Sequence, residues 1–491
     1  MNNVKTASGC LVLFGIPFFG MGLFFAVMSV RNLDNPRFQN PWIGVIFGSG
    51  FALIGLLIMA WGFQVPRRAR QLQAIQSAHP TEPWMWRDDW AQGRAIGQSV
   101  ASTGTAWMFA IFWNGISWFS VWAAFQKPQP SGKQWGYLVL AIFPAVGIGL
   151  FVWAMVNTLR RMRFGKTAMQ LQTVPAALGG DLRGTIDARL PYPLPHGINL
   201  ALTCVNRVTS GSGNNRSTFD HIVWQGKQEL GAERIMAGPM GSTIPVDIEV
   251  PRNLPRSSPE KSDNQILWLL RAEADLPGVD FDETYEVPVF ETSASPTLQD
   301  WQAKESAEER THPATAPIRP TVEVSSAPEG GTQFYFPAGR NASAGIGITV
   351  FALIFSAVDV GIYYMHAPIL FPIVFGFFTL LLWIITLNLW FGSARIVASS
   401  SGVTLHTNVL GIHSSKQWAP AQIQSVYPKI TMQSGGGGSG IPYYTATIQF
   451  DGGKEYSMGN PLRDHNEAEW VCAQIQQAAN VKAKSTAAGQ S

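Results

Sequence analysis

The sequence is poor in charged residues. Asp, Glu, Lys and Arg make up 14% of its 491 residues, whereas about 25% is usual for soluble globular domains. The 35 Lys and Arg outnumber the 32 Asp and Glu only slightly, so the net charge gives no indication of nucleic-acid binding. Aromatic residues are abundant instead, with 18 Trp and 29 Phe. This composition is typical of a membrane protein.

Cysteine is scarce as well. Cys10, Cys204 and Cys472 lie far apart in the chain, and no C-x-x-C pair occurs. This spacing excludes a disulfide framework and argues against a cysteine-based zinc site. Cys204 alternates with apolar residues along its segment. We therefore expect its side chain to be a small buried hydrophobe rather than a reactive thiol.

The familiar catalytic and cofactor-binding motifs are missing. The eight His residues are scattered, with no H-E-x-x-H motif and no i, i+4 pair, which argues against a metal site. Neither a P-loop nor a G-x-S-x-G elbow occurs. The run Gly435–Gly438 lies between two predicted strands with no helix after it, so we expect a hairpin loop there rather than a phosphate site. The sequence thus predicts no enzyme activity, no cofactor, and no catalytic, cofactor-binding or metal-binding residue.

Long apolar runs dominate the rest of the chain. About twenty apolar residues in a helix are enough to cross the hydrocarbon core of a bilayer. We interpret the first run as a retained helix and not a signal peptide, because it is long and no A-x-A-like cleavage site follows it. The sequence predicts six spans in three hairpins, at about 9–30, 43–64, 105–126, 135–158, 343–365 and 368–391.

Basic residues are distributed unevenly around these spans. On one side of the predicted membrane lie only Arg31, Arg37, Lys127 and Lys133. The other side carries the larger set, which comprises Lys5, Arg67, Arg68, Arg70, Arg87, Arg94, Arg160, Arg161, Arg163, Lys166, Arg340 and Arg395. Because cytoplasmic loops are rich in Lys and Arg, this bias places both termini and all large polar segments in the cytoplasm.

The polar segment after the fourth predicted span shows the pattern of β-structure. Apolar residues alternate with polar ones along Ile198–Cys204, Val246–Val250 and Ile266–Leu270. Alternation with a period of two indicates strands with one buried and one solvated face. Several short strands between turn residues, with no helical stretch, predict an antiparallel β-sandwich over about 167–292.

A second β domain is predicted near the C-terminus, over about 394–482. Its strands are followed by a helix with Asp464 as N-cap and Glu467 at the third helical position. A curved sheet closed by this helix is the expected fold. We also expect TQFYF at 332–336 to add a strand to the sheet, which would make the last helical hairpin an insertion in this domain.

A few polar residues are candidates for function. Asp359 is the one acidic residue well inside a predicted span, where it could couple proton movement or simply lie near the outer helix end. Asn114 could hydrogen-bond between helices. Basic residues at 67–70 and 160–166 could bind anionic lipid headgroups or act only as topology signals. The last candidates are four acidic residues, Asp275, Asp280, Asp282 and Glu283. They could form a cation site, or they could simply mark the ends of a turn.

Two segments resemble known families. Ile244–Phe290 resembles a pattern in uncharacterised bacterial inner-membrane proteins that carry a membrane domain of unknown function. Within it, W-x-L-x-x-x-A-D-x-P-G-x-D, from Trp268 to Asp280, is similar to arrestin-like and immunoglobulin-like β-sandwiches. The region 394–482 is similar to bacterial PH-like domains. These resemblances imply folds rather than an activity, because such modules usually bind or scaffold.

The sequence therefore predicts a membrane α-helical protein with six transmembrane helices in three hairpins, a cytoplasmic antiparallel β-sandwich and a small PH-like β domain. The predicted parts are a first hairpin at 1–64, a cytoplasmic loop with an interfacial Trp-rich segment at 65–104, a second hairpin at 105–158, the sandwich at 167–292, a linker without a core pattern at 293–321, strands at 322–342, a third hairpin at 343–391, the PH-like domain at 394–482 and a disordered tail at 483–491.

The expected role is a non-catalytic scaffold or binding protein in the bacterial inner (plasma) membrane. Its partners would be the lipid bilayer, anionic lipid headgroups and a protein on the cytoplasmic face, with no nucleic acid. The alternative is a transporter or channel component that uses Asp359.

Overall fold

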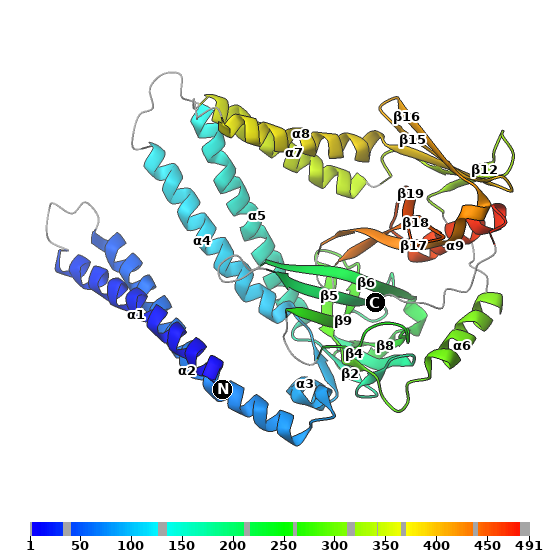
Figure 1. The fold of residues 1–491 in the computed structure, drawn as a ribbon. Coiled ribbons are helices and arrows are strands. Elements are labelled where there is room, and N and C mark those ends of the chain that lie inside the picture. The colour runs from blue at the N-terminus through cyan, green and yellow to red at the C-terminus, as the bar shows by residue number, and fades with distance from the viewer. Residues whose placement is uncertain are drawn as a thin grey trace. The chain divides into compact units, whose positions relative to one another are not determined.

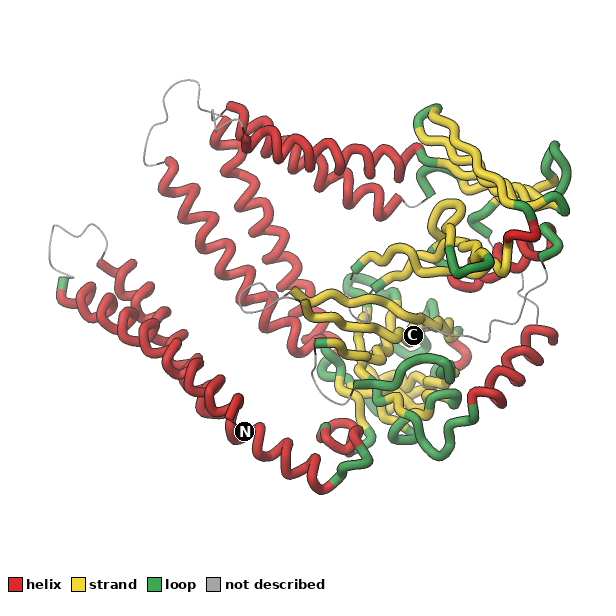
Figure 2. Tube along the Cα trace, in the orientation of Figure 1, coloured by secondary structure: helices red, strands yellow, loops and turns green. Residues whose placement is uncertain are grey.

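A computed structural model describes residues 2–32, 41–125, 135–210, 217–258, 263–311, 320–340, 342–364, 370–435 and 440–481. The predicted hairpin loop at 435–438, apart from Gly435 itself, and the predicted tail at 483–491 lie outside these residues. The chain divides into two units, Met1–Gln92 and Gly93–Ser491. Figure 1 labels the helices and strands, and Figure 2 shows the paired long helices in red and the strands in yellow.

The first unit is built on a helical hairpin, α1 (Asn2–Arg31) with α2 (Pro41–Ala78). Glycines allow the two helices to approach very closely. A Cβ placed on Gly22 would lie 2.3 Å from the backbone nitrogen of Ala52, and one on Gly48 would lie 2.4 Å from that of Ala26. Contacts this short exclude any side chain, so the helices pack backbone against backbone, as small residues permit in membranes.

The Trp-rich segment after α2 forms two short helices, η1 (Pro83–Trp86) and α3 (Asp88–Ala91). The indole N–H of Trp86 donates to the carbonyl of His79 at 2.8 Å. The guanidinium of Arg87 lies 4.0 Å from the centre of the Trp90 ring, and Trp90 is only 2% exposed. This segment is therefore a folded element, and its predicted contact with lipid stays a prediction.

The second unit contains two further hairpins. The first joins α4 (Ser99–Phe125) to α5 (Trp135–Phe164). The amide of Asn114 donates to the carbonyl of Gly147 at 2.8 Å, and Trp107 Nε1 donates to Thr158 Oγ1 at 2.8 Å. The prediction that Asn114 bonds between helices is thus confirmed.

The second of these hairpins joins α7 (Ala342–Tyr364) to α8 (Leu370–Phe391). Two tryptophans of α8 reach across to hydroxyls of α7. Trp383 Nε1 donates to Ser356 Oγ at 3.0 Å, and Trp390 Nε1 donates to Thr349 Oγ1 at 2.9 Å. Polar bonds of this kind hold neighbouring helices together where the surroundings are apolar.

Among the described residues, four helical segments are long and apolar enough to cross a membrane. They indicate a membrane-embedded protein. The other two predicted spans fall in α2 and α4, where the described residues do not form a segment of that length and apolarity. The four segments are Val12–Arg31, Phe143–Phe164, Gly345–Tyr363 and Pro372–Phe391.

The predicted sandwich is confirmed. Two antiparallel sheets enclose one core, in which Trp268 and Tyr285 are fully buried. The first sheet has the order β1 (Arg94–Ile96), β2 (Ala168–Leu171), β4 (Asp181–Ala188), β8 (Gly241–Glu249) and β7 (Met236–Gly238). The second has the order β10 (Phe281–Glu286), β9 (Asn264–Ala274), β5 (Ile198–Ser210) and β6 (Ser217–Leu230). A short parallel pair of β3 (Ala176–Ala177) with β11 (Val289–Phe290), and the turn η3 (Ala232–Arg234), complete it.

The expectation of one solvated face is wrong for the middle of the second sheet. Val205, Leu267 and Leu269 are buried on the face turned away from the main core. Beside them the buried amide of Gln225 donates to the carbonyl of Gly440, in the C-terminal β domain. Both faces of β5 and β9 are therefore covered, which alternation within one segment could not show.

The predicted linker contains helix α6 (Leu298–Thr311). Thr297 caps it, since its hydroxyl accepts from the backbone N–H of Asp300 at 3.2 Å. Trp301 is 6% exposed, so the prediction that nothing here fills a core is wrong at this residue. Lys304 also forms an ion pair with Glu249 on β8 of the sandwich.

The C-terminal domain has two sheets and a closing helix, α9 (His465–Ala478). Asp464 caps this helix as predicted, accepting from the N–H of Asn466. Strand β13 pairs with β14, which confirms that 332–336 joins the sheet and that α7 and α8 are an insertion. The first sheet runs β12 (Glu323–Ser326), β13 (Thr332–Phe336), β14 (Ser393–Ser399), β15 (Gly402–Val409) and β16 (Ile412–Trp418); the second, after η4 (Pro420–Gln422), runs β17 (Ile423–Ser434), β18 (Ile441–Phe450) and β19 (Glu455–Leu462).

Glu467 of α9 does more than serve as the predicted acidic residue at the third helical position. It is 3% exposed, and its carboxylate accepts from the hydroxyl of Thr321 at 2.9 Å and the N–H of Val322 at 3.0 Å. The segment that leads into β12 is thereby attached to the C-terminal helix. Charge-assisted bonds to a buried carboxylate are among the stronger hydrogen bonds in proteins.

Candidate functional site

Both β domains of the second unit carry a helical hairpin in the same way. In the sandwich, β1 precedes α4 and α5, and β2 follows them, and the two strands pair with Ala95 opposite Met169. In the C-terminal domain, β13 precedes α7 and α8, and β14 follows them, with Phe336 opposite Ala394. The chain thus leaves for each hairpin from one strand and returns on the adjacent, hydrogen-bonded strand. Sequence reasoning missed β1, which is only three residues long.

The junction of α5 with the sandwich is a packed contact. Phe164, the last residue of the helix, is 5% exposed and belongs to the sandwich core. Its ring lies edge-on to Phe281 with the ring centres 5.3 Å apart. One Arg163 nitrogen, Nη1, donates to the carbonyls of Pro277 and Val279 at 2.8 and 3.1 Å. These contacts fix the direction of the helix relative to the sheet.

Part of the basic cluster at 160–166 is used in this junction. Arg160 Nη1 lies 3.5 Å from the Asp282 carboxylate, which also accepts two bonds from Arg271 at 2.8 and 3.0 Å. The bonds with Asp282 raise the pKa of Arg271 above its usual value. The cluster therefore anchors the sandwich, a use that neither of the two sequence hypotheses, lipid binding and topology signalling, anticipated.

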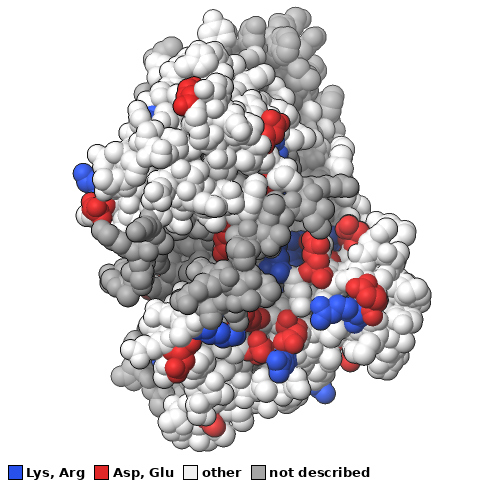
Figure 3. Space-filling view, turned by 90° about the vertical axis from the view of Figure 1, so that its right-hand side faces the viewer, with Lys and Arg blue, Asp and Glu red and all other residues white. Residues whose placement is uncertain are grey.

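Two of the four acidic residues that the sequence singles out, Asp280 and Asp282, form hydrogen bonds within the sandwich. Asp280 Oδ1 accepts from the N–H of Leu276 at 3.0 Å and so bounds the turn after β9, as one of the two hypotheses predicts. Glu283 is buried and Asp275 is exposed. On the face shown in Figure 3, Lys and Arg side chains likewise lie interspersed with Asp and Glu side chains.

Arg67 and Arg70 lie in the C-terminal part of α2, in the first unit, and both are exposed. Within the part of the chain that the structure describes, no contact of these two side chains favours lipid binding over topology signalling. Both hypotheses for residues 67–70 stay open.

Asp359 lies on α7 and faces α8. Thr379 Oγ1 donates to Asp359 Oδ2 at 2.6 Å. The second oxygen, Oδ1, is buried, and no partner for it occurs among the described residues. The acid therefore continues the row of polar bonds between these two helices while keeping one acceptor unused.

The two cysteines whose side chains the structure describes are buried. Burial raises the pKa of the Cys204 thiol to about 12, and it raises the pKa of the Cys472 thiol still further. A thiol reacts through its thiolate, and a free cysteine forms thiolate readily because its pKa is about 8.5. A thiol with a much higher pKa stays protonated and unreactive. Both side chains act as small apolar groups, Cys204 in the sandwich core and Cys472 in the C-terminal core.

Thiol labelling provides a direct check of this burial. We expect a Cys10→Ser variant of the full chain to take up no maleimide at pH 8 while folded, because Cys204 and Cys472 are inaccessible and protonated. In guanidinium the same protein should take up two equivalents, counted by intact-mass spectrometry. Rapid labelling of either thiol in the folded protein would contradict the buried positions.

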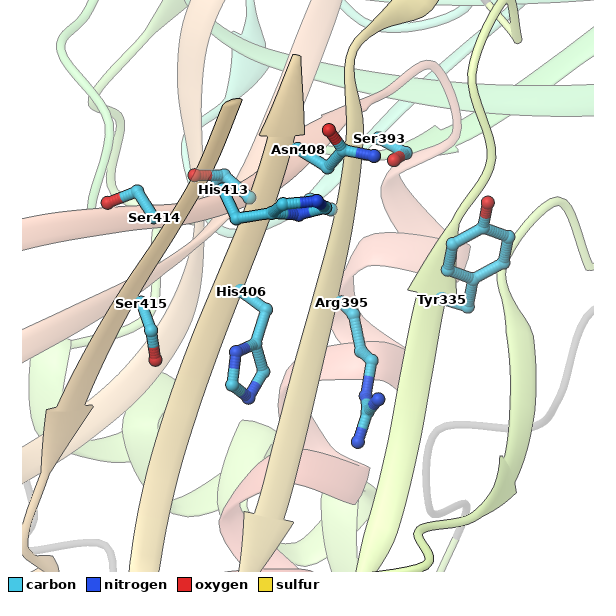
Figure 4. A pocket seen from close by; sticks show the side chains of 10 residues that line it. Tyr335, Ser393, Arg395, His406, Asn408, His413, Ser414 and Ser415 are labelled. Atoms are coloured by element: carbon cyan, nitrogen blue, oxygen red, sulfur yellow. The ribbon is translucent and has the colours of Figure 1, made fainter. Parts of the chain in front are cut away.

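A polar pocket of about 440 Å³ lies on the first sheet of the C-terminal domain (Figure 4). It faces away from the core, because its strand residues alternate with the buried Phe334, Phe336 and Ile396. Cross-strand pairing places Tyr335, Arg395, His406 and Ser415 in one row and Ser393, Asn408 and His413 in the next. The complete lining is Tyr335, Ser393, Ala394, Arg395, His406, Thr407, Asn408, His413, Ser414 and Ser415.

Among the described residues, the lining is rich in hydrogen-bond donors and contains no carboxylate. Its one permanent charge is that of Arg395, whose Nη2 is 2.8 Å from both carboxylate oxygens of Glu329. The Nε of the same guanidinium is buried, and no partner for it occurs in the part of the chain that the structure describes. Sequence reasoning missed the pocket, because its residues are brought together by the pairing of four strands, of which β13 precedes the hairpin insertion and β14, β15 and β16 follow it.

Comparison with known proteins adds little. No protein-family model matches the chain, and no curated protein is significantly similar to it. Among solved structures, the chain is similar to Spo0M, a sporulation control protein from Bacillus subtilis, at 9% identity over 52% of this chain and 89% of that one. The TM-score is 0.18. A likeness this weak supports no inference about fold or function, so the proposals below rest on the chain's own residues.

Proposed function

We propose that the protein is a non-catalytic scaffold that holds two β domains at the membrane surface for a protein partner. The observation that carries this proposal is the shared design of the two domains, each with a helical hairpin between adjacent paired strands. A domain joined to the bilayer through two neighbouring strands is held at two points. A domain on a single flexible linker would instead sample many orientations.

The finer features of the proposal come from the sequence. Six spans follow if α2 and α4 also cross the bilayer, and the basic residues then place both termini and the β domains on the cytoplasmic face of a bacterial inner membrane. A PH-like fold for the C-terminal domain is supported by its arrangement of two antiparallel sheets closed by α9. Arrestin-like packing of the sandwich is proposed from the motif Trp268 to Asp280.

The β7 edge of the sandwich is the proposed partner surface. Met236, Met240 and Tyr192 are exposed there, at 52%, 47% and 54%, and the edge strand β7 is short. Tyr192 is placed beside them because Ser242 on β8 donates to the neighbouring carbonyl of Pro191 at 2.9 Å. Exposed apolar side chains at one edge of a sheet are typical of interaction surfaces.

Photo-crosslinking in intact membranes tests the scaffold proposal. We expect a photoreactive residue at position 236 to capture one or a few specific proteins, and the same residue at the exposed position 219, on β6, to capture none of them. Turnover of a substrate by the purified protein, abolished by a point substitution, would contradict a non-catalytic role.

A transporter or channel component is the second candidate, and the unused buried oxygen of Asp359 favours it. A carboxylate inside a membrane span is expensive and is often kept for moving ions or protons. The scaffold proposal predicts that proteoliposomes show no ion or proton flux, either with the native Asp359 or with Asp359→Asn. The substitution should leave the pairing of α7 with α8 intact, because asparagine still accepts a hydrogen bond from Thr379. Proton flux that the substitution removes, with the helices still folded by circular dichroism, would favour the transporter.

A further inference from the structure

We infer that the polar pocket on the β13–β16 sheet binds a phosphate group at the membrane surface. The inference rests on the proposed function, because it takes the pocket as a binding site and the sheet as fixed beside the bilayer. Its first support is the lining, which offers a guanidinium, two imidazoles, a phenol and several hydroxyls and amides. Phosphate accepts hydrogen bonds from several directions, and Arg is well suited to supply them.

The pairing of Arg395 leaves room for a competing anion. Its partner Glu329 is 60% exposed at the side chain, whereas Arg395 is 30% exposed. An ion pair with so exposed a partner contributes little to stability, because water screens it. A phosphate in the pocket can therefore displace Glu329 from the Arg395 guanidinium, or share the guanidinium with it.

The position of the pocket brings it close to lipid headgroups. Ser393 begins β14 two residues after Phe391, the last residue of α8. At about 3.3 Å per residue, the row of Ser393, Asn408 and His413 stands roughly 7 Å beyond the end of that helix. The headgroup layer on each side of the hydrocarbon core is about that thick.

The turn between β15 and β16 points toward the same membrane. Because Asn408 pairs with Ser393, the turn at Leu410 and Gly411 extends past the start of β14 toward the end of α8. Figure 1 shows the β15–β16 hairpin beside the end of α8, and β15 contacts that helix. Leu410 and Ile412 at this turn are 56% and 77% exposed. Two exposed apolar side chains beside a membrane helix fit shallow insertion at the lipid interface.

The test uses the full chain in nanodiscs and measures backbone hydrogen exchange over 393–418. One arm compares phosphatidylcholine alone with phosphatidylcholine plus phosphatidylglycerol, and the other adds inorganic phosphate to the phosphatidylcholine discs. In phosphatidylcholine the choline cation of the same headgroup neutralises the phosphate, whereas phosphatidylglycerol presents a phosphate with a net negative charge. Exchange that slows with phosphatidylglycerol but not with inorganic phosphate identifies a lipid headgroup as the source of the phosphate. Slower exchange with inorganic phosphate alone identifies a soluble phosphate. Both outcomes support the pocket as a phosphate site.

Three variants connect the effect to the pocket. Arg395→Gln with His406→Gln should weaken the response to phosphate about tenfold or more, since bonds to a charged group are lost. Glu329→Gln should strengthen the response, because it removes the competing carboxylate, and this opposite sign separates a binding effect from misfolding. Lys454→Gln removes a positive charge at an exposed turn outside the pocket lining and should change nothing.

No change in exchange in either arm, or an equal change in the Arg395 and Lys454 variants, would overturn the inference. Such a result leaves the scaffold proposal standing, because capture of a partner at position 236 does not depend on this pocket. Conversely, substrate turnover or Asp359-dependent flux would overturn the scaffold proposal while leaving a phosphate response in place. The two failures are therefore distinguishable.

Discussion

Replacing Trp268 with alanine is expected to lower the free energy of unfolding of the sandwich by about 3–5 kcal/mol, the range for large aromatic residues removed from a core. Trp268 is completely buried. Its Nε1 donates to the carbonyl of Pro255 at 3.0 Å, and its ring lies 5.9 Å from that of Trp224. Truncation leaves a large cavity and removes the donor from a carbonyl, and both effects act in the same direction.

Hydrogen exchange of the β9 amides in the full chain measures this loss. Trp268→Phe keeps most of the ring and loses the hydrogen bond, so it should cost only part of the alanine effect. Trp118→Ala is the matched control, since this tryptophan of α4 is 53% exposed and should leave β9 unchanged. A loss below about 1 kcal/mol for Trp268→Ala would show that the core does not depend on this side chain.

Replacing Phe164 with alanine is expected to release the sandwich from α5. The ring is 5% exposed in the core, so its removal should cost about 3–5 kcal/mol. The loss falls at the junction of helix and sheet, where the bonds of Arg163 and Arg160 would remain. The predicted result is faster proteolysis and faster hydrogen exchange over 160–171, with the other hairpin unaffected.

Met162→Ala is the control for this experiment. It lies on the same turn of α5 and is 74% exposed, so its removal opens no cavity in the sandwich. Equal destabilisation by Phe164→Ala and Met162→Ala would mean that the junction is held by lipid contacts rather than by the protein core.

Local pattern in the sequence predicted much of the fold. Apolar runs predicted the long helices, and period-two alternation predicted the strands of both β domains. The attachment of 332–336 to the C-terminal sheet was also predictable, because the segment has strand character and directly precedes a hairpin. Asn114 was identifiable because a carboxamide between apolar residues needs a partner inside the membrane.

What the sequence could not provide is pairing between distant segments. Arg94–Ile96 is too short to show a period, and it becomes a strand only because β2 lies beside it. The outer face of β9 is covered through contacts between distant segments, and Tyr335 meets Arg395 only because β13 and β14 pair across the helical insertion. Trp301 looks like an isolated aromatic in a polar segment, and only tertiary packing shows that it is buried.

These pairings also bear on experiments with fragments. A fragment of 167–292 would begin after β1 and after Phe164, so it would lack the edge strand and two core residues of the sandwich, Ala95 and Phe164. Binding studies on the sandwich should therefore use the full chain.

The insertion of a hairpin between paired strands is the central claim, and disulfide formation tests it most directly. Arg94 lies opposite Gln170 in the β1–β2 ladder, and directly opposed residues in an antiparallel pair have Cα atoms about 4.5–5.5 Å apart, within reach of a disulfide. In a Cys10→Ser background, we predict that Arg94→Cys with Gln170→Cys cross-links in native membranes under mild oxidation. The shifted pair Arg94→Cys with Ala168→Cys should not. Equal cross-linking of both pairs, or of neither, would contradict the paired strands around the hairpin.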